Sequence, residues 1–367
     1  MRARRVMRGV ALAALLLAPL VLAEQLTLDS VRLLYPYLTN PREWPDAKLL
    51  ILRRVGCPQV LAIGSSITDR TLMRATTRGR RLRLAGDDLA PVTRLFSFGL
   101  HGQRGSLMYA TWRHVYTSGC VPPFVFVEMT PSVLRRGRGA ISQYAPLMTA
   151  PTLLLEPSGF MAEHRFRVRQ LAEFATWDRL LVYRQRDRLA RALVERAGLR
   201  PSSGDDRRFA ADGRIKKRVT RDLTGGRYER ERRHRTRLKQ EGRLEYGVSL
   251  VHLAAIRNLV REARAAGSHV VVHTPPATAI YRDIIADFGS AEAWCEINRA
   301  WTRDPEIDWY SAYDGEGYER QDFSDWVHLN RQGAYRYVER LFDAVNAGEF
   351  RSTPVCVPDA ASAPGPD

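Results

Sequence analysis

The sequence predicts an α/β protein in which a flavodoxin-like parallel sheet of about five strands lies between two layers of helices and carries a helical insertion. Two observations lead to this fold class. Short apolar runs alternate with helical segments along the chain, and this order favours a parallel sheet with crossover helices. One run, residues 123–129, is continuously apolar, as in a strand buried on both faces. A chain of 367 residues can form one large domain with an insertion.

The first part of the sheet is expected before residue 130. A strand, a tight turn and a helix come first, a second strand and helix follow, and the apolar run forms the third strand. A short helical lead-in with several prolines precedes them. The expected ranges are 24–55 for the lead-in, 59–63, 92–98 and 123–129 for strands, and 67–74 and 106–117 for helices.

The alternation of strands and helices resumes near residue 247 and continues to the last helix. The expected ranges are 269–273 and 307–310 for strands, and 247–266, 278–286, 290–302 and 331–346 for helices. The tail, 351–367, is rich in proline and alanine and is predicted to be flexible.

Residues 140–245 interrupt the alternation and are predicted to form a basic helical insertion within an α/β domain of residues 24–350. The chain as a whole has a net charge of +17, and the insertion is especially rich in arginine. One interpretation is a solvated helical segment; the other is a site for an acidic polymer or anionic lipid headgroups. Nucleic acid is not expected as a partner, because aromatic residues are sparse here and the protein is predicted to be exported.

The N-terminal residues 1–23 resemble an export signal. Several arginines precede the apolar stretch from Val10 to Ala23, which is short for a membrane span. This segment is either a cleaved signal peptide or an uncleaved membrane anchor, and a buried N-terminal helix is the third alternative. Both leading interpretations place the body of the protein outside the cytoplasmic membrane, in the periplasm or an equivalent compartment.

Export affects the interpretation of the four cysteines, whose spacing resembles no metal site. Cys57 precedes the first predicted strand and Cys120 the third, so both lie at one end of neighbouring strands. We therefore predict a Cys57–Cys120 disulfide, with Cys295–Cys356 as the remaining pair. The alternative is four unpaired buried thiols.

A serine and an Asp-x-x-His sequence supply the candidate chemistry. Ser66 lies where a strand turns into a helix, at the carboxyl edge of the predicted sheet. Asp325 and His328 lie three residues apart before the last helix. Together they provide a nucleophile, a base and a group that orients the base, which is the inventory for acyl transfer. The alternative is structural: Ser65 or Ser66 caps a helix, Asp325 caps another, and His328 is partly buried.

These residues resemble the sequence blocks of the SGNH (GDSL) hydrolase superfamily. The first block resembles residues 64–68, Gly-Ser-Ser-Ile-Thr; the second resembles residues 97–102; and the Asp-x-x-His block resembles residues 325–328. The resemblance covers about residues 57–135 and 247–346 and leaves the insertion unmatched. It implies that Ser66 is the nucleophile, His328 the base and Asp325 its partner. It also implies that the N–H groups of Ser66 and Gly102 bind the oxyanion.

The chain departs from the family pattern at two places. Ser65 replaces the aspartate of the first block. The third block normally supplies an asparagine after the third strand, whereas this chain has Thr130 and Ser132 there. Either hydroxyl is a candidate substitute donor for the oxyanion.

The resemblance implies an exported serine esterase or O-acyltransferase acting on acyl esters of cell-envelope carbohydrate, without metal or cofactor. Exported members of this kind often work beside a membrane-bound acyltransferase, which is therefore an expected partner. The alternative is a catalytically inactive envelope protein that binds polysaccharide or that partner. His273, His101 and Arg70 lie near the same edge and are not expected to be catalytic, although His273 is also considered as a substrate contact.

Overall fold

The computed structural model describes residues 44–83, 89–135, 233, 237, 247–287 and 289–350. Its centre is a parallel sheet of five strands in the spatial order β4-β1-β5-β6-β7. Numbered along the chain within this sheet, the order is 2-1-3-4-5, which is the flavodoxin-like order. The predicted fold class is therefore confirmed. The strands are β1 (Val60–Gly64), β4 (Leu95–Gly99), β5 (Phe124–Glu128), β6 (His269–Thr274) and β7 (Asp308–Ser311).

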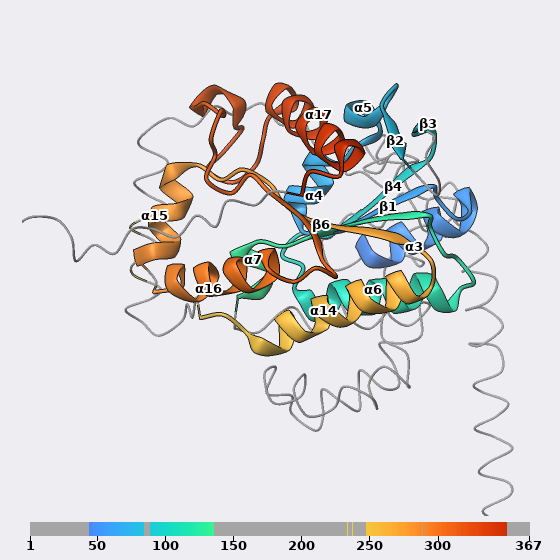
Figure 1. Ribbon diagram of the computed structural model, residues 1–367, viewed down its shortest axis with the longest axis horizontal. Helices are drawn as coiled ribbons and strands as arrows, with labels where there is room; N and C mark the ends of the chain where they lie inside the picture. Colours follow the sequence, from blue (N-terminus) through green and yellow to red (C-terminus); the bar gives the residue numbers. More distant parts are fainter. Residues whose placement is uncertain are drawn as a thin grey trace, which may run out of the picture.

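Helices cover both faces of the sheet (Figure 1). One face is packed by α3 (Trp44–Val55), α6 (Gly105–Thr117), α14 (Leu250–Ala265) and α16 (Ala291–Thr302). The other is packed by α17 (Arg331–Ala347), which also contacts the short helices α4 (Ser66–Thr71) and α5 (Arg74–Thr77). A further helix, α15 (Ala279–Asp287), leads into α16.

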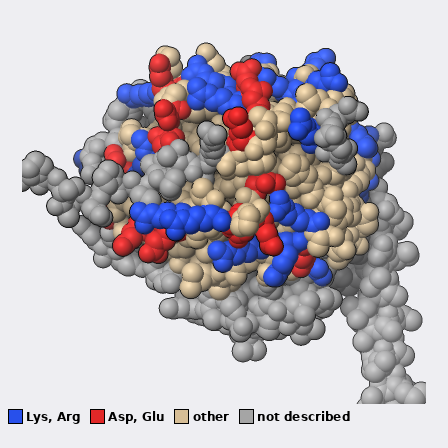
Figure 2. All heavy atoms as spheres, in the orientation of Figure 1, with Lys and Arg blue, Asp and Glu red and all other residues tan. Residues whose placement is uncertain are grey.

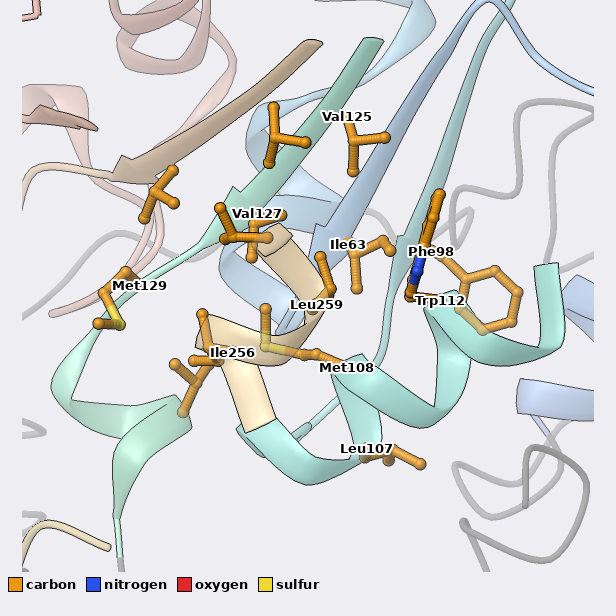
Figure 3. Packing of buried hydrophobic residues seen from close by; sticks show 14 of the residues in the cluster. Ile63, Phe98, Leu107, Met108, Trp112, Val125, Val127, Met129, Ile256 and Leu259 are labelled. Carbon is orange, nitrogen blue, oxygen red and sulfur yellow. The ribbon is translucent and has the colours of Figure 1, made fainter. Parts of the chain in front are cut away.

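The strand residues alternate between two separate apolar clusters. In β5, Val125 and Val127 belong to the cluster with α6 and α14, whereas Phe124 and Phe126 belong to the cluster with α17. Because successive side chains of a strand point to opposite faces, a strand between two helix layers must be apolar throughout. Figure 3 shows how Met108 of α6 and Leu259 of α14 lie against the sheet.

Three local features differ from the sequence-based expectation. The helix expected at 67–74 is divided into α4 and α5. The strand expected at 92–98 begins later, at Leu95, and a two-stranded antiparallel hairpin, β2 (Arg81–Arg83) and β3 (Leu89–Pro91), was not anticipated. The strand β2 has three residues, of which only Leu82 is buried, between two exposed arginines. Three residues are too few to show a periodic pattern.

Two short segments also connect the main elements: the helix α7 (Pro131–Leu134) and a 3₁₀ turn, η5 (Arg320–Asp322).

The predicted disulfide between Cys57 and Cys120 is present, with a Cα–Cα distance of 5.2 Å. Cys57 precedes β1 and Cys120 precedes β5, so the bond lies at the amino ends of two adjacent strands. Disulfides of this kind are typical of oxidising compartments outside the cytoplasm. Cys295 is buried in α16, and its predicted partner Cys356 lies outside the described residues.

Several predicted segments lie wholly or mostly outside the described residues: 1–23, the insertion 140–245 and the tail 351–367. Among the helices that the structure describes, none combines the length and the apolar character needed to cross a membrane. On the face shown in Figure 2, acidic and basic side chains are interspersed over the described surface. The positive charge of the chain therefore forms no single patch on the described part of that face.

Candidate active site

The turn between β1 and α4 distinguishes the roles of the two adjacent serines. Ser65 is the N-cap of α4, and its Oγ accepts a hydrogen bond from the N–H of Ile67 at 3.2 Å. Ser66 is the first residue of the helix, so its own hydroxyl is not used for capping. The sequence left open which serine caps the helix; in the structure Ser65 does so, and Ser66 Oγ is directed elsewhere.

Ser66, His328 and Asp325 are joined by hydrogen bonds in the order that the sequence predicts. Ser66 Oγ lies 2.9 Å from His328 Nε2, and His328 Nδ1 lies 2.8 Å from each carboxylate oxygen of Asp325. Because a carboxylate only accepts, the proton of the neutral ring belongs on Nδ1. The Nε2 atom then has a lone pair directed at the Ser66 hydroxyl, as a general base requires.

Asp325 is held by its own loop as well as by His328. Its Oδ1 accepts hydrogen bonds from the N–H groups of Val327 at 3.0 Å and His328 at 2.9 Å, while Oδ2 accepts one from Arg70 at 3.2 Å. Burial alone raises the pKa of Asp325. The hydrogen bond and charge of His328, together with the two backbone N–H groups, outweigh burial and hold this pKa well below its usual range. Arg70 thus contacts the carboxylate of the site.

The loop after β4 lies beside the Ser66 turn. Gly99 pairs with Gly64 in the sheet, and the N–H of Leu100 donates to the carbonyl of Gly64 at 2.9 Å. A β-carbon on Gly99 would lie 2.6 Å from the Ser65 carbonyl oxygen, so only glycine permits this close approach. Gly102 follows with φ +71°, a left-handed conformation that also favours glycine. This loop brings Gly102, the second expected oxyanion donor, to the same sheet edge as Ser66.

A buried glutamate at the end of β5 was not identified as a functional residue from the sequence. Glu128 is fully buried and accepts five hydrogen bonds. Ser65 donates two, from its N–H and its Oγ, both at 2.7 Å. Thr68 also donates two, from its N–H at 3.1 Å and its Oγ1 at 2.7 Å, and Thr130 Oγ1 donates the fifth at 3.0 Å. The sequence signal that could have identified Glu128 is an acidic residue at the end of an otherwise apolar strand, at the edge of the sheet where ligands bind.

Thr130 and Ser132, the hydroxyl residues expected as candidate oxyanion donors, already use their hydroxyl hydrogens. Thr130 Oγ1 donates to Glu128, and Ser132 Oγ lies 2.8 Å from Thr130 Oγ1. A hydroxyl has one hydrogen, so Thr130 must accept from Ser132 while it donates to Glu128. In this arrangement neither hydroxyl has a hydrogen left for an oxyanion.

His273 is structural rather than a substrate contact. It is fully buried at the end of β6, with Nδ1 3.1 Å from the Tyr337 hydroxyl and Nε2 3.4 Å from Thr68 Oγ1. Burial lowers the pKa of His273 to about 3, so the ring is neutral at physiological pH. Its ring therefore links α17 to α4 beneath the surface of the site.

This buried histidine predicts a pH dependence of stability. Unfolded His273 binds a proton below pH 6.5, whereas the folded residue does so only near pH 3. The contribution of the neutral His273 ring to the free energy of unfolding is therefore fully present above pH 6.5. It is lost as the pH falls towards 3, by about 1.4 kcal/mol per pH unit. His273→Gln should remove about one proton from this slope in urea unfolding between pH 4 and 7. Equal slopes in the two proteins would contradict the assignment.

A second buried network ties α3 to both loops of the site. Lys48 is fully buried, and its Nζ donates to Asp69 Oδ1 at 2.6 Å, to the Gly99 carbonyl at 2.6 Å and to the Ser97 carbonyl at 3.0 Å. Asp69 belongs to α4, the helix that begins with Ser66, and Gly99 begins the loop that contains Gly102. One ammonium group thus holds α4 and the end of β4 together.

The structure therefore brings the three predicted catalytic residues into hydrogen-bond contact and places Gly102 on the neighbouring loop. His101 is exposed in that loop. Within the described part of the chain, no group of three or more His, Cys, Asp or Glu residues is arranged to hold a metal ion. A comparison of the chain with protein-family models finds no match, and a comparison with curated protein sequences finds none either.

Proposed function

We propose that this protein is an exported serine esterase or O-acyltransferase of the SGNH type, acting on acyl esters of cell-envelope carbohydrate. The observation that carries the proposal is the continuous contact from Ser66 Oγ to His328 Nε2 at 2.9 Å and from His328 Nδ1 to Asp325 at 2.8 Å. The flavodoxin-like strand order supports it, because Ser66 follows β1 at the carboxyl edge where such sheets bind ligands.

The proposed reaction has two half-reactions. Ser66 Oγ attacks the acyl carbonyl carbon, its proton passes to His328 Nε2, and the carbonyl oxygen becomes an oxyanion facing the N–H groups of Ser66 and Gly102. Collapse breaks the ester C–O bond, and His328 returns the proton to the leaving alcohol. Water or a sugar hydroxyl then attacks the acyl-serine ester, with His328 again moving the proton. Water as the acceptor makes the protein an esterase; a sugar hydroxyl makes it a transferase.

The partners and location follow from the same proposal. The disulfide favours a compartment outside the cytoplasm, and the basic N-terminal segment is proposed to export the protein or anchor it in the cytoplasmic membrane. A membrane-bound acyltransferase is the proposed partner that supplies or receives the acyl group. The proposal requires no metal or cofactor.

Labelling with a fluorophosphonate tests the proposal. Ser66 Oγ should attack the phosphorus of the probe and displace fluoride, so that mass spectrometry finds the phosphonyl group on Ser66 of the purified protein. The Ser66→Ala variant should not be labelled. Ser132→Ala is the matched control, since its hydroxyl lies at the same edge but donates to Thr130; we expect labelling near the wild-type rate.

Two other outcomes are informative. A loss of about 100-fold or more in Ser132→Ala would make Ser132 an oxyanion donor. Folded wild-type protein that is not labelled would contradict the catalytic proposal. It would favour the alternative of an inactive envelope protein that binds polysaccharide or an acyltransferase partner.

A further inference from the structure

Ser65, the residue that departs from the family's first block, lies in direct contact with Glu128, the last residue of β5. Ser65 Oγ donates to Glu128 Oε1 at 2.7 Å, and the Ser65 N–H donates to Glu128 Oε2 at 2.7 Å. A single carboxylate therefore binds both polar groups of the residue that precedes the nucleophile. We propose that Glu128 is the positioning residue for Ser66 and that Ser65 and Glu128 form an interdependent pair.

The contacts of Glu128 surround the nucleophile along the chain. Ser65 and Thr68, on either side of Ser66 and Ile67, supply four of its five hydrogen bonds. Glu128 is therefore bonded to the chain just before Ser66 and again two residues after it. Glu128 is fully buried, and its backbone is part of a central strand. The carboxylate therefore has a fixed position from which to hold the turn.

The surroundings leave Glu128 little room to move. A β-carbon on Gly64 would lie 2.6 Å from both Cβ and Oε2 of Glu128. The hydroxyl groups around the carboxylate all donate towards it. Ser132 donates to Thr130, and Thr130 donates to Oε1 of Glu128. Thr68 donates to Oε2. Thr68 can then only accept from the Nε2–H of His273. Glu128 is thus the final acceptor of hydrogen-bond chains from both sides of the site.

This geometry explains why residue 65 is a serine. An aspartate there would place a second carboxylate against Glu128 at a position where the present contact is 2.7 Å, and two buried carboxylates at that distance repel. A hydroxyl can instead donate to Glu128 while it accepts from the Ile67 N–H. The family pattern has an oxyanion donor near the end of this strand. In this chain Glu128, at the end of β5, is instead an acceptor that holds the turn before Ser66.

A double-mutant cycle tests the pair. Ser65→Asp should destabilise the folded protein, raising the equilibrium constant for unfolding at least 10-fold. It should also slow phosphonate labelling of Ser66 by about 10- to 100-fold, because the nucleophile is misplaced. Glu128→Gln alone should slow labelling several-fold, because it removes charge-assisted bonds. Combined with Ser65→Asp, however, Glu128→Gln should be stabilising, since the amide N–H can donate to the introduced carboxylate. The matched control is Ser65→Asn, which has the same shape without the charge and should not be rescued by Glu128→Gln.

The inference rests on the proposed function in that Ser66 is the nucleophile, and the experiment separates the two failures. If Glu128→Gln changes stability equally in the Ser65 and Ser65→Asp backgrounds, the pairing is wrong. If both single variants are labelled at the wild-type rate, the positioning role is wrong while the proposed function stands. If the wild type is not labelled, the proposed function fails, and the unfolding cycle still decides whether Ser65 and Glu128 are coupled.

Discussion

Asp325→Asn is expected to slow the reaction of Ser66 with a fluorophosphonate by about 10³- to 10⁴-fold while the protein stays folded. The amide oxygen should replace Oδ1, because that atom accepts the N–H groups of Val327 and His328. The NH₂ group then replaces Oδ2 and faces both His328 Nδ1 and the guanidinium of Arg70. The NH₂ group can only donate to Nδ1, which favours the tautomer with the ring proton on Nε2, and in that tautomer His328 cannot accept the proton of Ser66. The amide oxygen stays 2.8 Å from Nδ1 but has no charge to stabilise the imidazolium that forms when Ser66 attacks.

Asp308→Asn is the matched control for this substitution. Asp308 is also a partly buried carboxylate bonded to an arginine and a histidine, Arg264 at 2.7 Å and His269 at 3.2 Å, but it lies at the opposite, amino edge of the sheet. We expect it to be labelled at nearly the wild-type rate. A loss of less than about 10-fold in Asp325→Asn would contradict the role of Asp325 as the partner of His328.

Lys48→Met is expected to destabilise the folded protein by about 3–5 kcal/mol, the largest loss of stability among the substitutions considered. Removing the ammonium leaves the buried carboxylate of Asp69 without this cation, and leaves the carbonyls of Ser97 and Gly99 without this donor. Breaking one side of a buried pair is more damaging than replacing both sides, because the remaining charge is desolvated. Urea unfolding at neutral pH measures the change.

Two comparisons make this prediction specific. Arg80→Ala breaks an exposed pair with Glu339 and should change the free energy of unfolding by less than about 1 kcal/mol. Lys48→Met combined with Asp69→Leu should be less destabilising than the sum of the two single changes. A loss below about 1 kcal/mol in Lys48→Met would show that the buried pair is not needed for stability.

Much of the fold could be predicted because its elements have strong local patterns. The run at β5 is apolar throughout, and the helix that became α17 begins after an Asn cap and ends at Gly348 with φ +68°. The Cys57–Cys120 bond was also predictable, because both residues precede strands that a flavodoxin-like order makes neighbours. The hairpin β2–β3 was missed because three-residue strands between charged residues show no usable period.

The candidate site was predictable only where its chemistry depends on residues close in sequence or in recognisable blocks. Ser66, Asp325 and His328 lie in segments that resemble such blocks. Glu128 and Lys48 do not, because their importance comes from partners that are distant in sequence: Glu128 lies 63 residues from Ser65, and Lys48 lies 51 residues from Gly99. Buried charged residues look like surface residues in a sequence, and only the packing shows which donors and acceptors they bind.

The bridge between Arg135 and Val248 has a consequence for how this chain can vary. The backbone leaves the α/β frame at Arg135 and returns at Val248, its bridge partner, and the Ser249 N–H donates to the Leu134 carbonyl at 2.7 Å. The two ends of a segment of more than one hundred residues thus meet like the base of a hairpin. Such a junction accepts segments of very different length, since closing a longer loop adds little entropic cost. We therefore expect that the segment between Arg135 and Val248 can be shortened or exchanged while the Ser66 turn and its buried anchors stay unchanged.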